Sequence, residues 1–408
     1  MSDCQPTALI LVFGPVTHDS RIFREAVTLR DLGFDVSIVG VVSADEQRTE
    51  IRINGFRVIR LTPVESLRRL LRRRPERRSD DVPVGESQAA APSAGRNHPR
   101  FTILRRLAIA SAYHFQGAVL VRRMSPDLVH ANDYNTMWIG IAAKLLCGSR
   151  LVYDAHELWP DQGRPEWRKW LVACEWLFVR LADATVAANP GIAETIAKRY
   201  RVAPPVVVRN VAERTVRSPA RPEGLRAGRK PLAVHVGSMA RERGIEQAIL
   251  ALALVPELRL RFMGPASEEY RAHLDRLAAE ARVADRIEYR APVEPTAVAE
   301  TIAGTDMGIV LTQPTCLNNV LSLPNKLFEY TAAGLPVIAS DLPVLGPLIR
   351  DEGIGEAVPP ADVEAIARAM RDLAEPKRNA ETRERVRSFA EQVTWERERR
   401  LLESIYAP

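Results

Sequence analysis

The stretch SLPNKLFEYTAAGLPVIASD, residues 322–341, indicates the fold because it joins a helix to a buried strand. Pro324 suits the first turn of a helix, where its missing N–H has no partner to lose. Gly334 is placed to end that helix, since glycine adopts the left-handed conformation that commonly follows a helix. The apolar run at 336–339 is typical of a strand buried on both faces. A helix followed directly by such a strand predicts an α/β domain with a parallel sheet.

The same alternation extends over both halves of the chain and predicts two doubly wound α/β domains. Helical patterns lie between short apolar runs, for example at 20–32, 136–146, 245–255 and 361–373. The predicted strands are 9–13, 36–39, 57–61, 128–130, 151–153, 184–187 and 206–208, and then 232–236, 258–263, 287–289, 307–311, 336–339 and 356–358.

The domain boundaries follow from one break in this pattern. Residues 212–230 are rich in Pro, Gly and Arg and have no apolar period, so they are predicted to link an N-terminal domain, 1–211, to a C-terminal domain, 231–390. The remaining residues, 391–408, contain an amphipathic helix at 394–406, for which Thr394 is a suitable N-cap.

The net charge of +6 comes from one segment, residues 65–106, which holds eleven arginines and five acidic residues. The rest of the chain is neutral, which argues against a nucleic-acid-binding protein with a broad basic face. We expect the segment to be a partly disordered insertion. A sharper hypothesis is that it contacts an anionic membrane and brings a lipid-linked acceptor to the protein.

Cysteine spacing and hydropathy favour a cytoplasmic protein, with any membrane contact peripheral and at the inner face. The four cysteines are far apart and form no CxxC pair, which fits a reducing compartment. No apolar run reaches the roughly 18 residues of a spanning helix.

The helix start in the opening stretch is a candidate anion site. The free amides of residues 322–325, together with Lys326, would lie at a helix N-terminus, where amides and the macrodipole favour phosphate. Glu329, one turn later, could accept hydrogen bonds from ligand hydroxyls. A second candidate follows strand 232–236, where Arg243 in a Gly-rich turn could clamp a diphosphate.

The ends of three strands in the N-terminal half also carry polar side chains, and the carboxyl ends of parallel strands meet at one sheet edge. The first strand is followed by Gly14, His18, Asp19 and Arg21; the strand at 128–130 is followed by Asn132 and Asp133, with His130 at its end; the strand at 151–153 is followed by Asp154, His156 and Glu157. No zinc motif and no DxD motif occurs, so no metal or other cofactor is predicted.

Seven segments together resemble the retaining glycosyltransferases of family 4, including those of bacterial exopolysaccharide and glycan synthesis. They are HDSRIFREAVTLRDLGFDVSIVG (18–40), PDLVHANDYNT (126–136), LVYDAHELWPD (151–161), VVVRNVAE (206–213), HVGSMARERGIEQAI (235–249), LPNKLFEYTAAGLPVIASD (323–341) and TWERERRLLESIY (394–406). The resemblance implies the GT-B architecture, in which two Rossmann-like domains face each other and the last helix crosses back onto the N-terminal domain.

The resemblance also implies roles for individual residues. Glu329 would hold the ribose hydroxyls, and Arg243 would neutralise the diphosphate. The implied catalytic set is His130, Asp133, His156, Arg243 and Lys326. The implied donor-binding set is Gly237, Ser238, Arg241, Arg243, Ser322, Leu323, Pro324, Asn325, Lys326 and Glu329. The acceptor-side set is Gly14, His18, Asp19, Arg21, Asp154 and Glu157.

Three positions depart from the family pattern. Leu321 stands where a second glutamate is usual, Ser238 where a basic residue is frequent, and Asn132 where a second histidine is usual. Arg241 is a candidate substitute for the missing basic residue. These changes leave the nucleotide-diphosphate prediction intact and leave the transferred sugar open.

The predicted function is therefore metal-independent, retaining transfer of a sugar from a UDP- or GDP-linked donor to a saccharide, lipid-linked or small-molecule acceptor. Two alternatives remain open. The first is a sugar-nucleotide epimerase of the same fold. The second is a non-catalytic nucleotide-sugar-binding subunit of a larger assembly.

Overall fold

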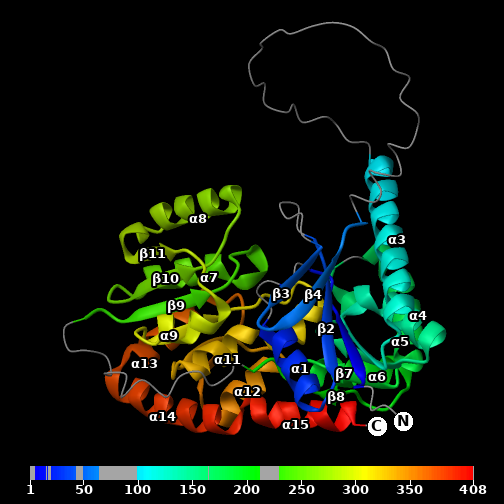
Figure 1. Cartoon of the computed structure of the whole chain (residues 1–408). Coiled ribbons are helices and arrows are strands. Elements are labelled where there is room, and N and C mark those ends of the chain that lie inside the picture. Colours follow the sequence, from blue (N-terminus) through cyan, green and yellow to red (C-terminus); the bar gives the residue numbers. More distant parts are fainter. Residues whose placement is uncertain are drawn as a thin grey trace, which may run out of the picture.

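The computed structural model describes residues 5–14, 16, 20–42, 49–63, 99–163, 165–211 and 229–407, with side chains of 99–107 left out. Two α/β domains stand side by side (Figure 1). Several predictions fall outside the described residues: those on His18 and Asp19, most of the basic segment 65–106, and the linker up to residue 228.

The N-terminal domain is built on an eight-stranded sheet of order β3-β4-β2-β1-β5-β6-β7-β8, parallel except for the β3–β4 pair. Its strands are β1 (Thr7–Leu11), β2 (Asp35–Val41), β3 (Glu50–Ile53), β4 (Phe56–Leu61), β5 (Leu128–Asn132), β6 (Arg150–Ala155), β7 (Ala184–Ala187) and β8 (Val206–Val207). Its helices are α1 (Ser20–Asp31), α3 (Pro99–Met124), α4 (Met137–Cys147), α5 (Pro165–Leu181) and α6 (Pro190–Tyr200).

The C-terminal domain is built on a six-stranded, all-parallel sheet of order β11-β10-β9-β12-β13-β14. Its strands are β9 (Leu232–Val236), β10 (Arg259–Met263), β11 (Ile287–Arg290), β12 (Met307–Val310), β13 (Val337–Ser340) and β14 (Gly355–Val358). Its helices are α7 (Ile245–Ala253), α8 (Glu268–Glu280), α9 (Val298–Ile302), α10 (Leu317–Val320), α11 (Asn325–Ala332), α12 (Leu345–Glu352), α13 (Val363–Ala374) and α14 (Pro376–Gln392).

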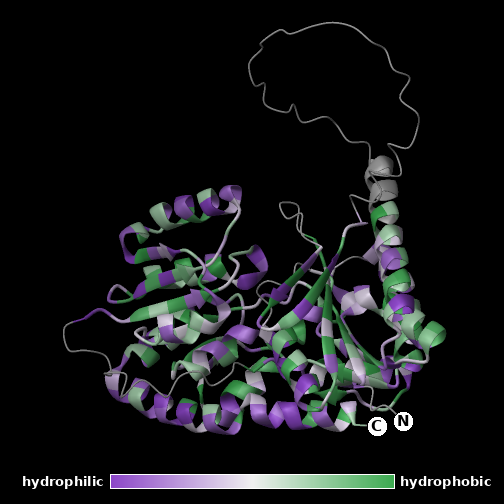
Figure 2. Cartoon of the chain, in the orientation of Figure 1, coloured by the Kyte–Doolittle hydropathy of each residue, from purple (hydrophilic) through white to green (hydrophobic). Residues whose placement is uncertain are grey.

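Both sheets are covered on both faces, which explains why their strands are continuous apolar runs. In β1, Leu9 and Leu11 pack under α3 to α6, whereas Ala8 and Ile10 pack on the opposite face with α1. In Figure 2 the strands are mainly green, hydrophobic, whereas α8 and α14 contain many purple, hydrophilic residues. The predicted strand–helix alternation is confirmed.

Strand β3 was not predicted, although the sequence carries a signal for it. Asn54 and Gly55 form the two-residue turn between β3 and β4, with φ of 50° and 84°. An Asn-Gly pair between apolar residues is the strongest short-range hairpin signal, because both residues tolerate positive φ. The strand is short and lies at the sheet edge, so its hydropathy pattern alone is weak.

Helix α15 (Trp395–Tyr406) follows α14 and packs on the N-terminal domain (Figure 1). Trp395 and Leu402 join Ile22 and Leu29 of α1 in one apolar cluster. Thr394 occupies the N-cap position, but its side chain makes no capping hydrogen bond. No helix among the described residues is long and apolar enough to cross a membrane.

Candidate active site

A cleft of about 1020 Å³ lies between the two domains, where the carboxyl ends of both sets of strands meet. This is where ligands of open α/β sheets bind. Of the predicted site residues, the cleft is lined on the N-terminal side by Gly14, Arg21, Asp133, His156 and Glu157, and on the C-terminal side by Gly237, Ser238, Arg243, Ser322, Leu323, Pro324, Asn325, Lys326 and Glu329.

On the C-terminal wall of the cleft, the backbone turn after β9, at Gly237, lies close to the backbone turn after β10, at Gly264. Gly237 adopts φ of 98°, and a Cβ on Gly264, at φ of 149°, would lie 2.2 Å from the Gly237 carbonyl oxygen. Only glycine avoids that overlap. Gly264 therefore lets the turn after β10 lie directly against the turn after β9. A Cβ on Gly237 would lie 4.0 Å from the amino group of Lys326.

Arg243 and Lys326 form a cationic pair on this wall. Lys326 lies in the first turn of α11, and its Nζ is 3.4 Å from Nε2 of His235. Burial lowers the pKa of Lys326 to about 7, with the Arg243 charge adding to the effect and Glu329 opposing it. Among the described residues, no carboxylate lies within ion-pair distance of either cation. Cations held together without a counter-charge indicate a site for an anion.

Glu329 lies one turn further along α11 and also lines the cleft. Burial raises the pKa of its carboxyl group, while Lys326 acts in the opposite direction. Its side chain makes no hydrogen bond within the described part of the protein. The carboxyl group is therefore available to accept hydroxyl hydrogen bonds from a ligand.

Arg241 and Leu321, two positions singled out on the donor side of the sequence, do not line the cleft. Arg241 does not line the cleft: its guanidinium group points outward to Glu246, at 3.9 Å, and lies 5.6 Å from the Tyr270 ring. It is therefore not the substitute for a basic residue at Ser238. Leu321 is half-buried and packs against the apolar core of the N-terminal domain.

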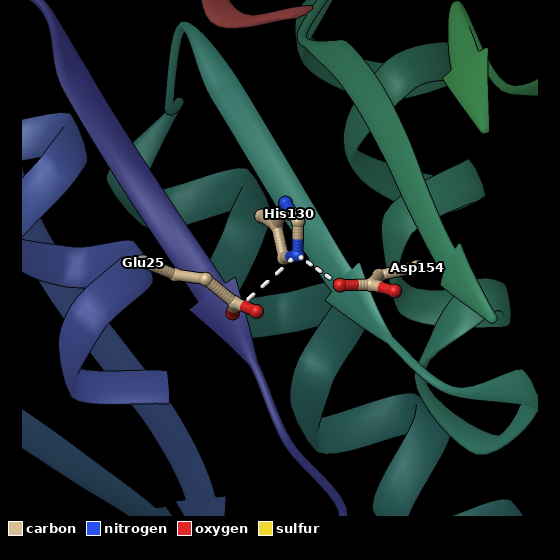
Figure 3. Close-up of side chains that lie close together, drawn as sticks. All are labelled: Glu25, His130 and Asp154. Carbon is tan, nitrogen blue, oxygen red and sulfur yellow. Dashed lines mark hydrogen bonds and ion pairs between the residues drawn. The ribbon is translucent and has the colours of Figure 1, made fainter. Parts of the chain in front are cut away.

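The N-terminal wall is backed by a buried charge network centred on Asp154 at the end of β6. Its Oδ2 accepts from Arg21 at 2.5 Å and lies 3.3 Å from Nε2 of His130 and 3.2 Å from Nε2 of His156. Burial would raise the pKa of Asp154, but Arg21 and the histidines hold it well below its usual value. Figure 3 shows His130 between Glu25 and Asp154.

His130 lies behind the cleft and does not face it. It is completely buried, so its predicted place in the catalytic set, in contact with substrate, does not fit its position. Asp154 is likewise buried behind the wall. Of the residues predicted at the ends of β5 and β6, Asp133, His156 and Glu157 line the cleft.

Asp133 and His156 face each other at the cleft surface, with His156 Nδ1 3.8 Å from Asp133 Oδ2. Burial would lower the pKa of His156, but Asp154 and Asp133 outweigh it and raise the pKa to about 9. Burial raises the pKa of Asp133 to about 6. At neutral pH the wall therefore presents an imidazolium beside a carboxylate, a pair suited to orienting sugar hydroxyls.

Glu25, His130 and Asp154 are near enough to one another to hold a metal ion. However, Arg21 already binds Glu25 Oε1 at 2.9 Å and also binds Asp154. The guanidinium group thus already supplies a positive charge in contact with both carboxylates. This cluster does not fit a metal site.

Sequence reasoning missed several cleft residues, among them Asn189, Asn210, Gly264 and Asn318. Asn189 follows β7, Asn210 follows β8 and Gly264 follows β10, so the strand-end rule could have found these three. Asn318 lies on the short helix α10 and carries no such signal.

Two family models match the chain and together span most of it. "Glycosyl transferase 4-like domain" matches residues 20–212, and "Glycosyl transferases group 1" matches residues 216–393. Sulfoquinovosyl transferase SQD2 of Arabidopsis thaliana is 24% identical over 298 residues, which are 67% of this chain and 54% of the plant protein. The match thus spans about half the length of that relative.

Solved structures share the fold over nearly their whole length. Sucrose-phosphate synthase from Thermosynechococcus elongatus superposes with a TM-score of 0.72 at 19% identity, covering 99% of this chain and 98% of the other. HepE of Anabaena in complex with UDP-glucose gives a TM-score of 0.68 at 14% identity, covering 98% of each chain. The chain therefore belongs to the family-4 type of glycosyltransferases, with the GT-B architecture of two facing Rossmann-like domains.

Proposed function

We propose that this protein transfers a sugar from a nucleoside diphosphate sugar to an acceptor hydroxyl, with retention of anomeric configuration and without a metal ion. The observation that carries the proposal is the pair Arg243 and Lys326, which line the cleft without a carboxylate partner among the described residues. A diphosphate would supply the missing negative charge. Because negative charge develops on the diphosphate as the bond to the sugar breaks, the two cations would stabilise the transition state more than the bound donor.

The neighbouring groups fit the other parts of such a donor. Glu329 is placed to accept from ribose hydroxyls, and Pro292 and Val293 offer an apolar surface for a base at the same wall. HepE, which shares the fold, binds UDP and UDP-glucose. UDP-linked donors are therefore the first to test, and GDP-linked donors the second.

Retention would follow from attack on the same face of the sugar that the diphosphate leaves. The acceptor oxygen forms the new bond to the anomeric carbon as the bond to the diphosphate oxygen breaks, and the acceptor proton passes to that leaving oxygen. Asp133 and His156 would orient sugar or acceptor hydroxyls from the opposite wall. Because Arg243 and Lys326 neutralise the leaving group, we expect turnover to persist in EDTA.

Alanine variants of the donor wall test the site. Arg243→Ala and Glu329→Ala should each lower kcat/KM by about 10²-fold, in line with the loss of one transition-state contact. Arg241→Ala is a matched control. Arg241 is two residues before Arg243 in the sequence, but its guanidinium group points outward, away from the cleft. Unchanged turnover in both site variants, with thermal unfolding like that of the wild type, would exclude this donor site.

Product analysis separates the alternatives. An epimerase converts the donor without an acceptor, and a binding subunit binds nucleotide without turnover. A thermal-shift screen of UDP, GDP and ADP with their sugars comes first, because ligand at 100 times its Kd stabilises by about 2.7 kcal/mol. Radiolabelled donor with and without an acceptor panel then decides between transfer and isomerisation.

We also propose that the protein works in the cytoplasm and that the acceptor is presented at an anionic membrane. The support is the charge of segment 65–106, whose eleven arginines exceed its acidic residues by six. Each surface arginine contributes about 1 kcal/mol of attraction to such a membrane. Co-sedimentation with vesicles of anionic lipid at low salt should retain the protein, and neutral vesicles should not. Absence of binding to both would exclude the contact.

A further inference from the structure

We infer that Tyr406 of α15 is a positioning residue that acts through His130 and Asp154 on His156. The Tyr406 hydroxyl lies 3.0 Å from Nδ1 of His130, and Nε2 of His130 lies 3.3 Å from Oδ2 of Asp154. The same Oδ2 lies 3.2 Å from Nε2 of His156. A continuous chain of polar contacts thus joins α15 to the cleft. The inference rests on the proposed function in one respect: that function supplies the sugar or acceptor hydroxyls that His156 would orient.

The direction of the hydrogen bonds follows from what each group can donate. Nε2 of His130 faces two carboxylate oxygens, Oδ2 of Asp154 and Oε2 of Glu25, the latter at 3.4 Å. Ionised carboxylates only accept, so this nitrogen must carry a proton. Burial raises the pKa of Tyr406 well above its usual value, which keeps its hydroxyl protonated and able to donate.

The other ring nitrogen of His130, Nδ1, faces the Tyr406 hydroxyl at 3.0 Å. The imidazole is thus held at both ends, by the two carboxylates at Nε2 and by the phenol at Nδ1. The tyrosine hydroxyl therefore holds the ring in the orientation that directs Nε2 at Asp154.

The chain is sheltered from solvent at every step before the cleft. Tyr406 is 2% exposed, and His130 and Asp154 are fully buried, so water cannot replace a missing partner. Other contacts fix the helix in place. Glu398 accepts from the backbone N–H of Arg209 at 2.8 Å, and Arg399 binds Asp31 at 2.9 Å. A helix that follows the C-terminal domain in sequence therefore completes the wall of the N-terminal domain.

Loss of the hydroxyl should loosen the histidine that faces the cleft. Without the phenol at Nδ1, the His130 ring is no longer held in one orientation, and Asp154 loses a fixed donor. The charged groups facing His156 are Asp154 from β6, Asp133 after β5, Arg21 from α1 and the adjacent Glu157. Asp154 is the nearest, so its displacement should lower the pKa of His156.

Tyr406→Phe in the full chain tests the inference, with Tyr200→Phe as the matched control. Tyr200 is equally buried, and its hydroxyl donates to a buried carboxylate, that of Glu175, at 2.6 Å. NMR titration of the His156 imidazole, assigned with His156→Asn, should show a fall of at least about 0.5 in its pKa in Tyr406→Phe only. Turnover should fall about tenfold, while UDP affinity stays within twofold of wild type.

A second pair of variants, at His130, tests the inference independently in case Tyr406→Phe does not fold. His130→Gln keeps an N–H donor near the position of Nε2, and His130→Ala removes it, so the glutamine variant should retain more turnover. An unchanged His156 pKa in Tyr406→Phe, or equal loss in both His130 variants, would overturn the inference. Absence of transfer by the wild-type protein would instead refute the proposed function, and the His156 titration would still decide the role of Tyr406.

Discussion

The side-chain oxygen of Asn318 accepts a hydrogen bond of 2.7 Å from the backbone N–H of Leu158. Asn318 belongs to α10 of the C-terminal domain, and Leu158 precedes the 3-10 turn Trp159–Asp161 of the N-terminal domain. The bond therefore joins the two domains beside the cleft, which Asn318 also lines. Leu321, three residues later, adds an apolar contact to the N-terminal core.

Asn318→Ala should weaken domain closure without unfolding either domain. The backbone N–H of Leu158 would lose its partner, at a cost of about 1–3 kcal/mol if it stays buried. We expect kcat/KM to fall about tenfold and thermal unfolding to change by a few degrees at most. Steady-state kinetics and calorimetry measure both. Wild-type kinetics in this variant would show that the bond does not contribute to closure.

Gly191→Ala tests the same interface by crowding. Gly191 lies in α6, and a Cβ there would be 2.6 Å from Cγ2 of Val344 and 3.4 Å from Cβ of Leu321. Within a helix, alanine is favoured over glycine by about 1 kcal/mol, so α6 itself should tolerate the change. We expect lower turnover with an intact fold, and small-angle X-ray scattering should show a larger radius of gyration. A compact, fully active variant would contradict this.

The sequence predicted the fold well because buried parallel strands leave a clear pattern. Strands β7 and β9 begin and end where predicted, and helix α11 begins just after Pro324, with Gly334 at φ of 73° beyond its end. These signals are local: apolar runs, a proline and a glycine. Strand β3 was missed because its signal was the turn at its end and not its own hydropathy.

The site was predicted only where a side chain's direction follows from its element. Arg243 and Lys326 line the cleft as expected, because a strand-end turn and a helix start both point there. Arg241 is two residues from Arg243 yet points outward, and the sequence does not show the rotation of a short 3-10 turn. His130 lies within β5 and not beyond it, so it faces the core. Contacts such as that of Asn318 depend on the packing of two domains and leave no pattern in either segment.

Lys326 predicts a pH dependence of donor binding. Its pKa is about 7 in the free protein because of burial and Arg243, and a bound diphosphate should raise it. Above pH 7 the amine is mainly neutral, so binding takes up a proton and affinity falls as pH rises; below pH 7 affinity should be flat. Calorimetry at pH 8 in buffers of different ionisation enthalpy should show uptake approaching one proton for a nucleotide sugar. Lys326→Met should abolish the uptake, and no uptake by the wild type would contradict the prediction.

Asp133 combines an unusual backbone conformation with a place in the cleft, and two variants can separate these properties. Its φ and ψ are 63° and 165°, a region essentially limited to glycine, which costs other residues about 1–3 kcal/mol. Both Asp133→Gly and Asp133→Ala remove the carboxylate beside His156, so both should lose turnover and lower the pKa of the imidazole. Only the glycine variant relieves the backbone. The glycine variant should therefore have a free energy of unfolding about 1–2 kcal/mol higher than that of the alanine variant in urea titrations. At an ordinary helical position the alanine variant would be the more stable of the two. Equal stabilities would mean that the positive φ is not retained in solution.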